Sequence, residues 1–506
     1  MDSADLLGLL NEHWGYPSFR GRQEAIVQNI LEGRDVAVVM PTGGGKSLCY
    51  QLPAVAMQRT CVVVSPLIAL MQDQAAQLQQ VGISAALLNS SLSPAEQRDA
   101  VKQAQQGKLR LLYLSPERLV REDSVEWLRR IPLGFFAIDE AHCISEWGHE
   151  FRPEYRRLRA LREWFPDTPI AAFTASATRA VRHDIIAQLR LRDPAKFVMS
   201  FHRPNLRYVV RQCAAREHES LLGYALEAYA EGNVIVYAPT VKSVDETATV
   251  LSRRGFPVVA YHGQMDTAQR RENQEAWMSG EKRILVGTLA FGLGINKPDV
   301  RAVVHLSLPK SLEQYYQEAG RAGRDGREAD CVLLWQRRDA GLLAHFIQQL
   351  EDRAERDRAW QRYHAMRTFA ESAECRHRQI CLHFGETPKW GKCGVCDACG
   401  VELDWLAQAG RKADVPRVRK RVAALAPVNP ALRAALRDWR LQRARELAVP
   451  AYVVLHDSTL DEIAARSPTS IARLCEISGI GVKKAERFGA GILAVIAATD
   501  RVSPSR

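Results

Sequence analysis

A glycine-rich segment near the start of the chain carries the residue types that bind phosphate groups. The apolar run at 36–40 leads directly into Pro41-Thr42-Gly43-Gly44-Gly45-Lys46-Ser47. Glycines let backbone N–H groups surround phosphate oxygens without Cβ clashes, Lys46 adds a point charge, and the Ser47 hydroxyl can ligate Mg²⁺. This order of strand, glycine turn and helix start predicts an ATP site with Mg²⁺. Met40 stands where the strict spacing has glycine, and such turns also arise by chance.

An acidic pair lies 93 residues after Lys46. Asp139-Glu140-Ala141-His142 follows the apolar run at 135–138, and parallel sheets bind their ligands at the carboxyl ends of the strands. We expect Asp139 to hold Mg²⁺ and Glu140 to orient and deprotonate the attacking water. Surface charge is the alternative interpretation, but the combination with Lys46 favours ATP hydrolysis.

Two arginines form a third candidate element of the same site. Arg321 and Arg324 lie three residues apart in a glycine-containing segment at 317–324. Side chains at this spacing share one face of a helix, so both could reach a phosphate cluster from a second domain. An arginine in that position stabilises charge that develops on the γ-phosphoryl group. The alternative is an ordinary basic helix surface.

Four of the eleven cysteines have the spacing of metal ligands. Cys393, Cys396 and Cys399 form a Cys-x2-Cys-x2-Cys pattern, and Cys375 upstream is the expected fourth ligand. Four thiolates suit a closed tetrahedral zinc site, which is structural because no coordination position stays open. An iron–sulfur cluster also takes four cysteines. Three other residues are close enough to compete as the fourth ligand: His377, Cys381 and His383.

Short apolar runs alternate with longer helical stretches from residue 35 to about residue 334. Because these runs are continuously apolar, they predict strands buried on both faces, which is typical of parallel sheets covered by helices. The expected strands include 36–39, 62–64, 111–114, 135–138, 170–173, 234–237, 258–261, 284–286 and 302–306. The length fits two such sheets, with a break near 200–205.

The 506 residues suffice for several domains with separate cores. We expect an α/β chain with sheet domains at 1–200 and 201–340 and a helical metal-binding region at 341–408. A basic linker at 409–428 and a small all-α bundle at 429–506 complete the prediction.

The net charge of +11 is concentrated towards the end of the chain. Residues 411–445 hold eleven basic and two acidic side chains, and such a density favours a polyanionic partner through counterion release. A solvated basic face without a partner is the alternative. No apolar run is long enough to span a membrane, and the acidic start differs from a signal peptide, so a cytoplasmic location is expected.

These motifs together resemble the RecQ family of superfamily 2 DNA helicases. The most specific segment is 139–153, where RecQ proteins extend the acidic motif into an aromatic-rich loop that couples single-stranded DNA binding to ATP hydrolysis. The resemblance assigns this role to His142, Trp147, Phe151 and Arg152. Aromatic rings can stack on bases without reading sequence. Taken alone, Trp147 and Phe151 would be interpreted as core aromatics.

The resemblance extends over nearly the whole chain and implies two tandem RecA-like lobes. It implies that Tyr16 stacks on adenine, that Gln23 reads its edge and that Arg20 lies near by. It favours zinc over an iron–sulfur cluster. Further matching segments are 65–74, 114–118, 174–178, 261–263 and 288–299. Asn296 stands where the family usually has Asp, which removes a carboxylate near the lobe interface.

The last part of the chain resembles an HRDC domain, the small helical bundle that accompanies RecQ motors. A glycine turn at 477–481 opens a basic helix with Lys483 and Lys484, which predicts a phosphate contact. A module that packs only on protein is the alternative. Only about thirty residues separate Cys399 from this bundle, where typical RecQ proteins carry a winged-helix domain.

The resemblance therefore implies an ATP-dependent DNA helicase that moves 3′ to 5′ on single-stranded DNA and unwinds duplex or branched DNA in repair or recombination. The cofactors expected are ATP, Mg²⁺ and Zn²⁺. DNA is the expected substrate, and single-strand-binding or recombination proteins are the expected partners. One alternative is a single-strand translocase or branch-remodelling ATPase that unwinds weakly. Another is a non-enzymatic DNA-binding scaffold.

Overall fold

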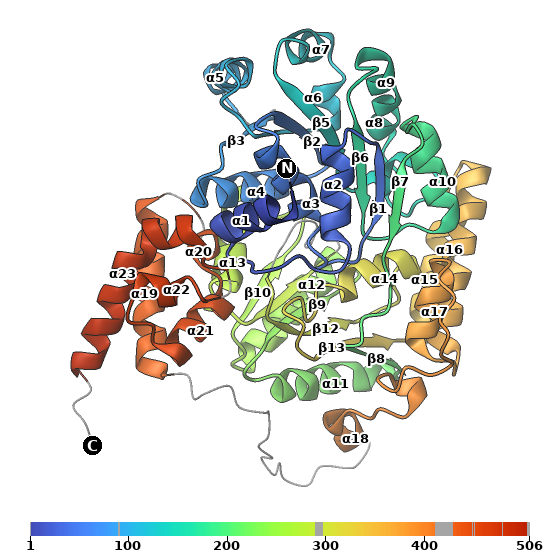
Figure 1. Cartoon of the computed structure of the whole chain (residues 1–506). Coiled ribbons are helices and arrows are strands. Elements are labelled where there is room, and N and C mark those ends of the chain that lie inside the picture. Colours follow the sequence, from blue (N-terminus) through green and yellow to red (C-terminus); the bar gives the residue numbers. More distant parts are fainter. Residues whose placement is uncertain are drawn as a thin grey trace.

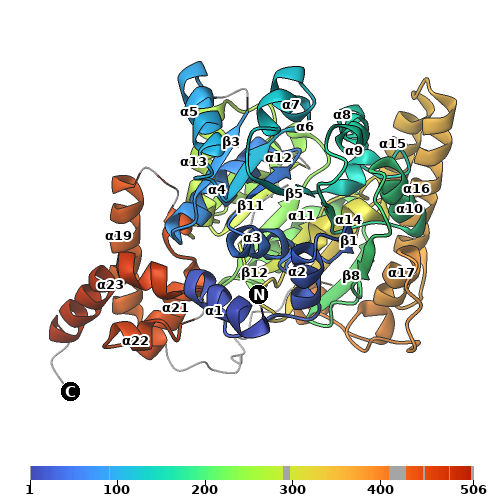
Figure 2. The same cartoon turned by 45° about the horizontal axis from the view of Figure 1, so that its top comes forward.

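The computed structural model describes residues 2–502 except 90–91, 289–296, 410–428, 448, 450 and 478. Asn296 and nearly all of the predicted linker lie outside the described residues. Two α/β lobes form the bulk of the molecule, and helices of the C-terminal third lie on either side of them (Figures 1 and 2). No helix in the described ranges is long and apolar enough to cross a membrane.

The first lobe contains a seven-stranded sheet in the order β3-β4-β2-β5-β6-β1-β7. All its strand pairs are parallel, as the apolar runs predicted. Its strands are β1 (Val36–Val39), β2 (Thr60–Val64), β3 (Ala85–Leu88), β4 (Leu111–Leu114), β5 (Leu133–Ile138), β6 (Ile170–Thr174) and β7 (Ala195–Val198). Its helices are α1 (Ser3–Trp14), α2 (Gln23–Leu31), α3 (Lys46–Ala56), α4 (Ile68–Gln80), α5 (Pro94–Gln105), α6 (Pro116–Leu119), α7 (Glu122–Leu128), α8 (Pro153–Arg156), α9 (Leu161–Trp164) and α10 (Arg179–Gln188).

The second lobe contains a six-stranded parallel sheet in the order β10-β11-β9-β12-β13-β8. Its strands are β8 (Leu206–Gln212), β9 (Asn233–Tyr237), β10 (Val258–Tyr261), β11 (Ile284–Gly287), β12 (Val300–His305) and β13 (Ala329–Trp335). Its helices are α11 (Ala215–Ala228), α12 (Val241–Arg253), α13 (Thr267–Met278) and α14 (Leu312–Ala319).

The interior strands are buried along most of their length because both faces of each sheet are covered by helices. Every residue of β2 and β6 is buried, which matches their unbroken apolar sequences. The predicted set omits four strands. Three of them, β3, β7 and β8, are edge strands, and β7 alternates between half-buried and exposed positions. An edge strand is covered less completely, so a polar residue such as Lys196 of β7 can interrupt its apolar sequence.

Helices form the rest of the described chain. The metal-binding region contains α15 (Arg337–Gln348), α16 (Arg353–Glu371), α17 (Arg376–His383) and α18 (Asp404–Ala409). The C-terminal bundle contains α19 (Pro430–Glu446), α20 (Ala451–Val454), α21 (Asp457–Arg466), α22 (Ile471–Leu474) and α23 (Val482–Val502). Phe488 is buried in the core of this bundle and Trp439 packs against that core, so both aromatic rings have a structural role there.

The C-terminal bundle packs against both lobes. Helix α23 contacts α1 and helix α20 contacts α4, both in the first lobe (Figure 1). Towards the second lobe, the buried Lys297 donates a 2.8 Å hydrogen bond to Asp457 Oδ2. Asp457 also pairs with the fully buried Arg440 at 2.8 Å, so one carboxylate contacts a cation from the lobe and a cation from the bundle.

Candidate active site

The glycine-rich turn connects β1 to α3 at the carboxyl edge of the first sheet. Gly43 and Gly45 both have φ of 82°, a conformation that other residues rarely adopt. Helix α3 then begins at Lys46, whose Nζ lies 3.3 Å from the carbonyl oxygen of Met40. Burial lowers the pKa of the Lys46 ammonium, and the carboxylates of Glu140 and Asp139 oppose that shift. A half-buried cation at the start of a helix that follows a glycine turn suits the phosphates of a nucleotide.

The predicted acidic pair lies at the end of β5, inside the same pocket as Lys46. Burial and the charge of Glu140 raise the pKa of Asp139 to about 7. Burial opposes ionisation of Glu140 as well, but the hydrogen bond from His142 lowers its pKa to about 2. A buried carboxylate that is costly to ionise is stabilised when it binds a cation. The Ser47 hydroxyl lines the same pocket and accepts a 3.3 Å hydrogen bond from Gln74. These donors fit Mg²⁺.

Arg321 and Arg324 of the second lobe lie at the same pocket as this glycine turn. A Cβ atom on Gly43 would lie 3.2 Å from Arg324 Cγ, and one on Gly320 would lie 2.9 Å from Thr42 Oγ1. Glycine at both positions therefore permits the close approach of the lobes. The Nε and Nη1 atoms of Arg321 are buried with no hydrogen-bond acceptor among the described residues. Burial and the charges of neighbouring arginines lower the pKa of Arg324 to about 9. Such crowded cations favour an anionic ligand.

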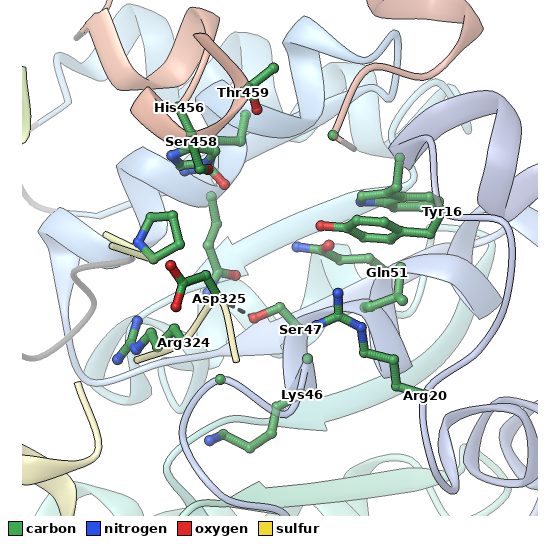
Figure 3. Close-up of a pocket in the computed structure, with 18 of the residues that line it drawn as sticks. Tyr16, Arg20, Lys46, Ser47, Gln51, Arg324, Asp325, His456, Ser458 and Thr459 are labelled. Atoms are coloured by element: carbon green, nitrogen blue, oxygen red, sulfur yellow. Dashed lines mark hydrogen bonds between the residues drawn. The ribbon is translucent and has the colours of Figure 1, made fainter. Parts of the chain in front are cut away.

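A cavity of about 770 Å³ connects these groups with the residues predicted to bind adenine. Tyr16, Arg20 and Gln23 line it, and the Arg20 guanidinium lies 5.8 Å from the centre of the Tyr16 ring. Figure 3 shows Tyr16 and Arg20 on one side of the pocket, with Lys46 and Ser47 between them and Arg324. The Gln23 amide donates a 3.0 Å hydrogen bond to the carbonyl of Gly44, so this side chain also braces the glycine turn.

The aromatic-rich loop combines buried and exposed members. His142 is fully buried, where its Nδ1 lies 2.9 Å from Thr174 Oγ1 and 3.2 Å from Glu140 Oε2. Trp147 is 55% exposed and Phe151 is 36% exposed, whereas side chains of this size usually bury more of their surface. Arg152 is half-buried and donates a 3.3 Å hydrogen bond to the Pro66 carbonyl. His142 therefore faces the carboxylate of Glu140, and the two exposed rings face solvent.

The four predicted metal ligands come together. The Sγ atoms of Cys375, Cys393, Cys396 and Cys399 all lie within 4.8 Å of one another. Two of these distances are 3.9 Å (Cys393 to Cys399) and 4.0 Å (Cys396 to Cys375). A tetrahedral zinc ion with Zn–S bonds of about 2.3 Å separates its sulfurs by about 3.8 Å, so the cluster fits zinc. The His377 ring approaches Cys393, but the cysteines alone complete the set.

Family profiles match four consecutive parts of the chain. They are a DEAD/DEAH box helicase domain at residues 20–184, a helicase conserved C-terminal domain at 217–326, a RecQ zinc-binding domain at 337–400 and an HRDC domain at 429–496. An ATP-dependent DNA helicase RecQ from Pasteurella multocida is 33% identical over an alignment that includes 97% of this chain and 93% of the relative. The chain belongs to the RecQ family.

Other RecQ relatives agree with this placement. The ATP-dependent DNA helicase RecQ of Bacillus subtilis is 31% identical, with 98% of this chain and 99% of the relative covered. The helicase SGS1 of Saccharomyces cerevisiae is 36% identical over 78% of this chain but only 28% of its own length. Among solved structures, Saccharomyces cerevisiae Dbp5 bound to RNA and ADP BeF3 superposes with a TM-score of 0.54 at 16% identity, covering 73% of this chain and 94% of Dbp5. That similarity shows the two-lobe fold.

This RecQ protein has pocket residues that the sequence did not reveal. His456, Ser458 and Thr459 of the C-terminal bundle line the same cavity as the glycine turn, and Figure 3 shows them reaching it from the bundle side. Burial lowers the pKa of His456 to about 3, so its ring adds no positive charge there. No spacing in the sequence indicates that a segment more than 400 residues after Lys46 would pack at the ATP site.

Proposed function

We propose that this RecQ protein is an ATP-dependent DNA helicase that translocates 3′ to 5′ on single-stranded DNA and unwinds duplex or branched DNA. The observation that carries the proposal is the division of one phosphate pocket between two lobes. Lys46 and the acidic pair come from the first lobe, and Arg321 and Arg324 come from the second. Such a site is complete only when the lobes are together, so ATP binding and hydrolysis can open and close the molecule.

Each site residue has a role in this proposal. Thr42, Gly43, Gly44 and Gly45 present backbone N–H groups to the phosphates, and Lys46 binds the β and γ phosphates. Ser47 and Asp139 would hold Mg²⁺, which would neutralise negative charge on the phosphates. Glu140, ionised because of its low pKa, accepts a proton from the attacking water.

Arg321 and Arg324 stabilise the charge of the transferring phosphoryl group. Tyr16, Arg20 and Gln23 hold the adenine.

The link to DNA runs through the aromatic-rich loop. We assign base stacking to Trp147 and Phe151 because both rings are exposed. Arg358 lies 6.0 Å from the Trp147 ring and Arg156 lies 5.7 Å from the Phe151 ring, so each stacking site has a cation for the DNA backbone. His142 connects this loop to Glu140, and a shift of the loop would change the environment of the catalytic base.

The proposed division of the chain follows the sequence prediction. We propose lobes at 1–200 and 201–340, a zinc-binding subdomain at 341–408, a basic linker at 409–428 and an HRDC domain at 429–506. Contact of the HRDC domain with DNA, partnership with single-strand-binding or recombination proteins, and a location at the bacterial nucleoid within the cytoplasm belong to the same proposal.

A second candidate function is translocation on single-stranded DNA with weak strand separation. The zinc-binding profile ends at residue 400 and the HRDC profile begins at residue 429, which leaves too few residues for a winged-helix domain between them. A non-enzymatic scaffold is disfavoured because the charged groups that ATP hydrolysis needs, Lys46, Asp139, Glu140, Arg321 and Arg324, all line one pocket.

Strand separation on duplexes of defined ends tests the proposed function. The full chain is incubated with ATP and Mg²⁺ on 3′-tailed, 5′-tailed, forked and blunt duplexes, while ATP hydrolysis is followed in parallel. The helicase proposal expects unwinding of 3′-tailed and forked substrates and none with Lys46→Ala. DNA-stimulated hydrolysis without unwinding would leave the translocase. Hydrolysis that persists in Lys46→Ala would overturn the motor assignment.

A further inference from the structure

Arg203 lies in the connection between β7 and β8, where the chain passes from the first lobe to the second. Within the part of the chain that the structure describes, its half-buried guanidinium donates hydrogen bonds to backbone carbonyl groups alone. Nη1 donates to the carbonyl of Gly320 at 2.8 Å, and Nη2 donates to those of Ala322 at 3.1 Å and Gly323 at 2.8 Å. A longer contact of 3.5 Å joins Nη1 to the carbonyl of Thr42.

These four carbonyls belong to the two segments that form the phosphate pocket. Gly320 and Ala322 flank Arg321, and Gly323 directly precedes Arg324. Thr42 lies in the glycine turn of the opposite lobe. One planar guanidinium therefore fixes the backbone on both sides of the first arginine and immediately before the second. The rigid fork of arginine suits this arrangement, since its donors keep fixed directions.

Two neighbouring side chains, Asn205 and His377, make hydrogen bonds that help to fix Arg203 and the segment that carries Arg321 and Arg324. The Asn205 amide donates to the carbonyls of Gly323 at 2.8 Å and Arg327 at 2.9 Å. On the other side, His377 Nε2 donates a 3.1 Å hydrogen bond to the carbonyl oxygen of Arg203. His377 lies on α17 of the zinc-binding region, so the backbone of Arg203 is anchored there while its side chain reaches the pocket.

We propose that Arg203 is a positioning residue for ATP hydrolysis. Its guanidinium holds Arg321 and Arg324 at the distance from the glycine turn that the γ-phosphoryl group requires. The inference rests on the proposed function of the pocket and assigns a role to a residue outside every phosphate-binding motif. Arg203 does not act as a third phosphate ligand, because Nη1 and Nη2 already donate to carbonyl groups.

Two substitutions separate positioning from charge. Arg203→Lys retains the positive charge but loses the planar set of guanidinium donors. Arg203→Ala loses both the charge and the donors. Because small displacements of catalytic groups reduce rates strongly, both variants should lower the kcat of DNA-stimulated ATP hydrolysis by about 10- to 100-fold. The KM for ATP, the binding of a fluorescent ATP analogue and the zinc content should stay near wild-type values. Arg207→Lys is the matched control, because Arg207 pairs with Asp330 away from the pocket.

A double variant gives a readout that a purely structural role would not produce. If Arg203 acts through the arginine segment, Arg203→Lys should add little to the loss in Arg324→Ala, whereas independent effects would multiply. A wild-type kcat in Arg203→Lys would overturn the inference. It would also be overturned if the losses of kcat multiplied in the double variant, or if the loss of kcat in Arg203→Lys equalled the fraction of unfolded protein. Absence of DNA-stimulated hydrolysis in the wild-type chain would instead refute the proposed function, so the two failures are distinguishable.

Discussion

The side-chain amide of Gln317 donates a 2.7 Å hydrogen bond to the Ser176 hydroxyl. Gln317 lies on α14 of the second lobe, and Ser176 follows β6 of the first, so this buried bond joins the lobes. Thr174, two residues before Ser176, contacts the His142 ring at 2.9 Å. The bond thus lies at one end of a short series of polar contacts that leads to Glu140, and it would be broken whenever the lobes separate.

Removal of the Ser176 hydroxyl should weaken the coupling between the lobes. In Ser176→Ala the buried Gln317 amide loses an acceptor, which costs about 1–3 kcal/mol in the closed state. We expect DNA-stimulated ATP hydrolysis to fall about 5-fold or more, because each 1.36 kcal/mol changes a rate tenfold. Steady-state kinetics measure this. Ser124→Ala is the control, since Ser124 is also buried but bonds within the first lobe to the Arg118 carbonyl. Equal rates in wild type and Ser176→Ala would contradict the prediction.

Loss of the exposed Trp147 ring should uncouple DNA binding from hydrolysis. Base stacking on an aromatic side chain contributes about 1–3 kcal/mol per base, so Trp147→Ala should raise the DNA concentration needed for half-maximal stimulation by about 5-fold or more. ATPase titrations with single-stranded DNA provide the measurement. Phe346→Ala serves as the comparison, because Phe346 is 52% exposed on α15, outside the loop. An unchanged titration curve in Trp147→Ala would remove this loop from the DNA site.

The cysteine cluster should bind one zinc ion that stabilises the fold. Cys396→Ser removes a buried ligand, and loss of a structural metal belongs to the largest destabilising effects, about 4 kcal/mol or more. Metal analysis should find about one zinc per chain in the wild type and none in the variant, with a lower midpoint of urea unfolding. Cys475→Ser, in the C-terminal bundle, should retain the metal. Full zinc content in Cys396→Ser would refute the site.

A buried glutamate that is hydrogen-bonded to a histidine should make stability depend on acid pH. Burial opposes ionisation of Glu313 on α14, but a 2.7 Å hydrogen bond from His383 lowers its pKa from 4.5 to about 2. Because the folded pKa lies below the unfolded value, this contribution is complete above pH 4.5 and disappears as pH falls towards 2. The full effect is about 3 kcal/mol.

Chemical unfolding at several pH values from 7 to 3 measures this contribution. Glu313→Gln should be less stable at pH 7 and should lose less stability on acidification than the wild type. Glu117→Gln, which changes an exposed glutamate, should keep the wild-type dependence. Parallel curves for wild type and Glu313→Gln would show that the pair contributes nothing.

The sequence alone predicted the parts of the site that lie within short motifs. Lys46, Asp139 and the cysteines at 393–399 lie in recognisable patterns because each group is built on one turn, one strand end or one compact loop. The parallel sheets were predictable for the same kind of reason, since a strand buried on both faces must be apolar throughout.

The remaining features depend on contacts between distant segments. Arg203 binds carbonyl groups about 120 residues away, and a carbonyl acceptor leaves no trace in the side-chain sequence. The position of His456 at the ATP pocket depends on how the C-terminal bundle packs on both lobes. Lys297 and Asp457 form an ion pair that joins the bundle to the second lobe. Nothing in the sequence near either residue indicates this pairing, because the two residues become neighbours only in the folded chain.

The most direct test of the shared pocket is the rate of ATP hydrolysis by Arg324→Ala at saturating single-stranded DNA. Arg324 belongs to the second lobe but approaches the glycine turn of the first. The account predicts that hydrolysis falls about 10³-fold, as for loss of an arginine that stabilises phosphoryl transfer, while binding of an ATP analogue stays close to wild type. A rate equal to the wild-type rate would show that the first lobe hydrolyses ATP alone, and would contradict the central claim.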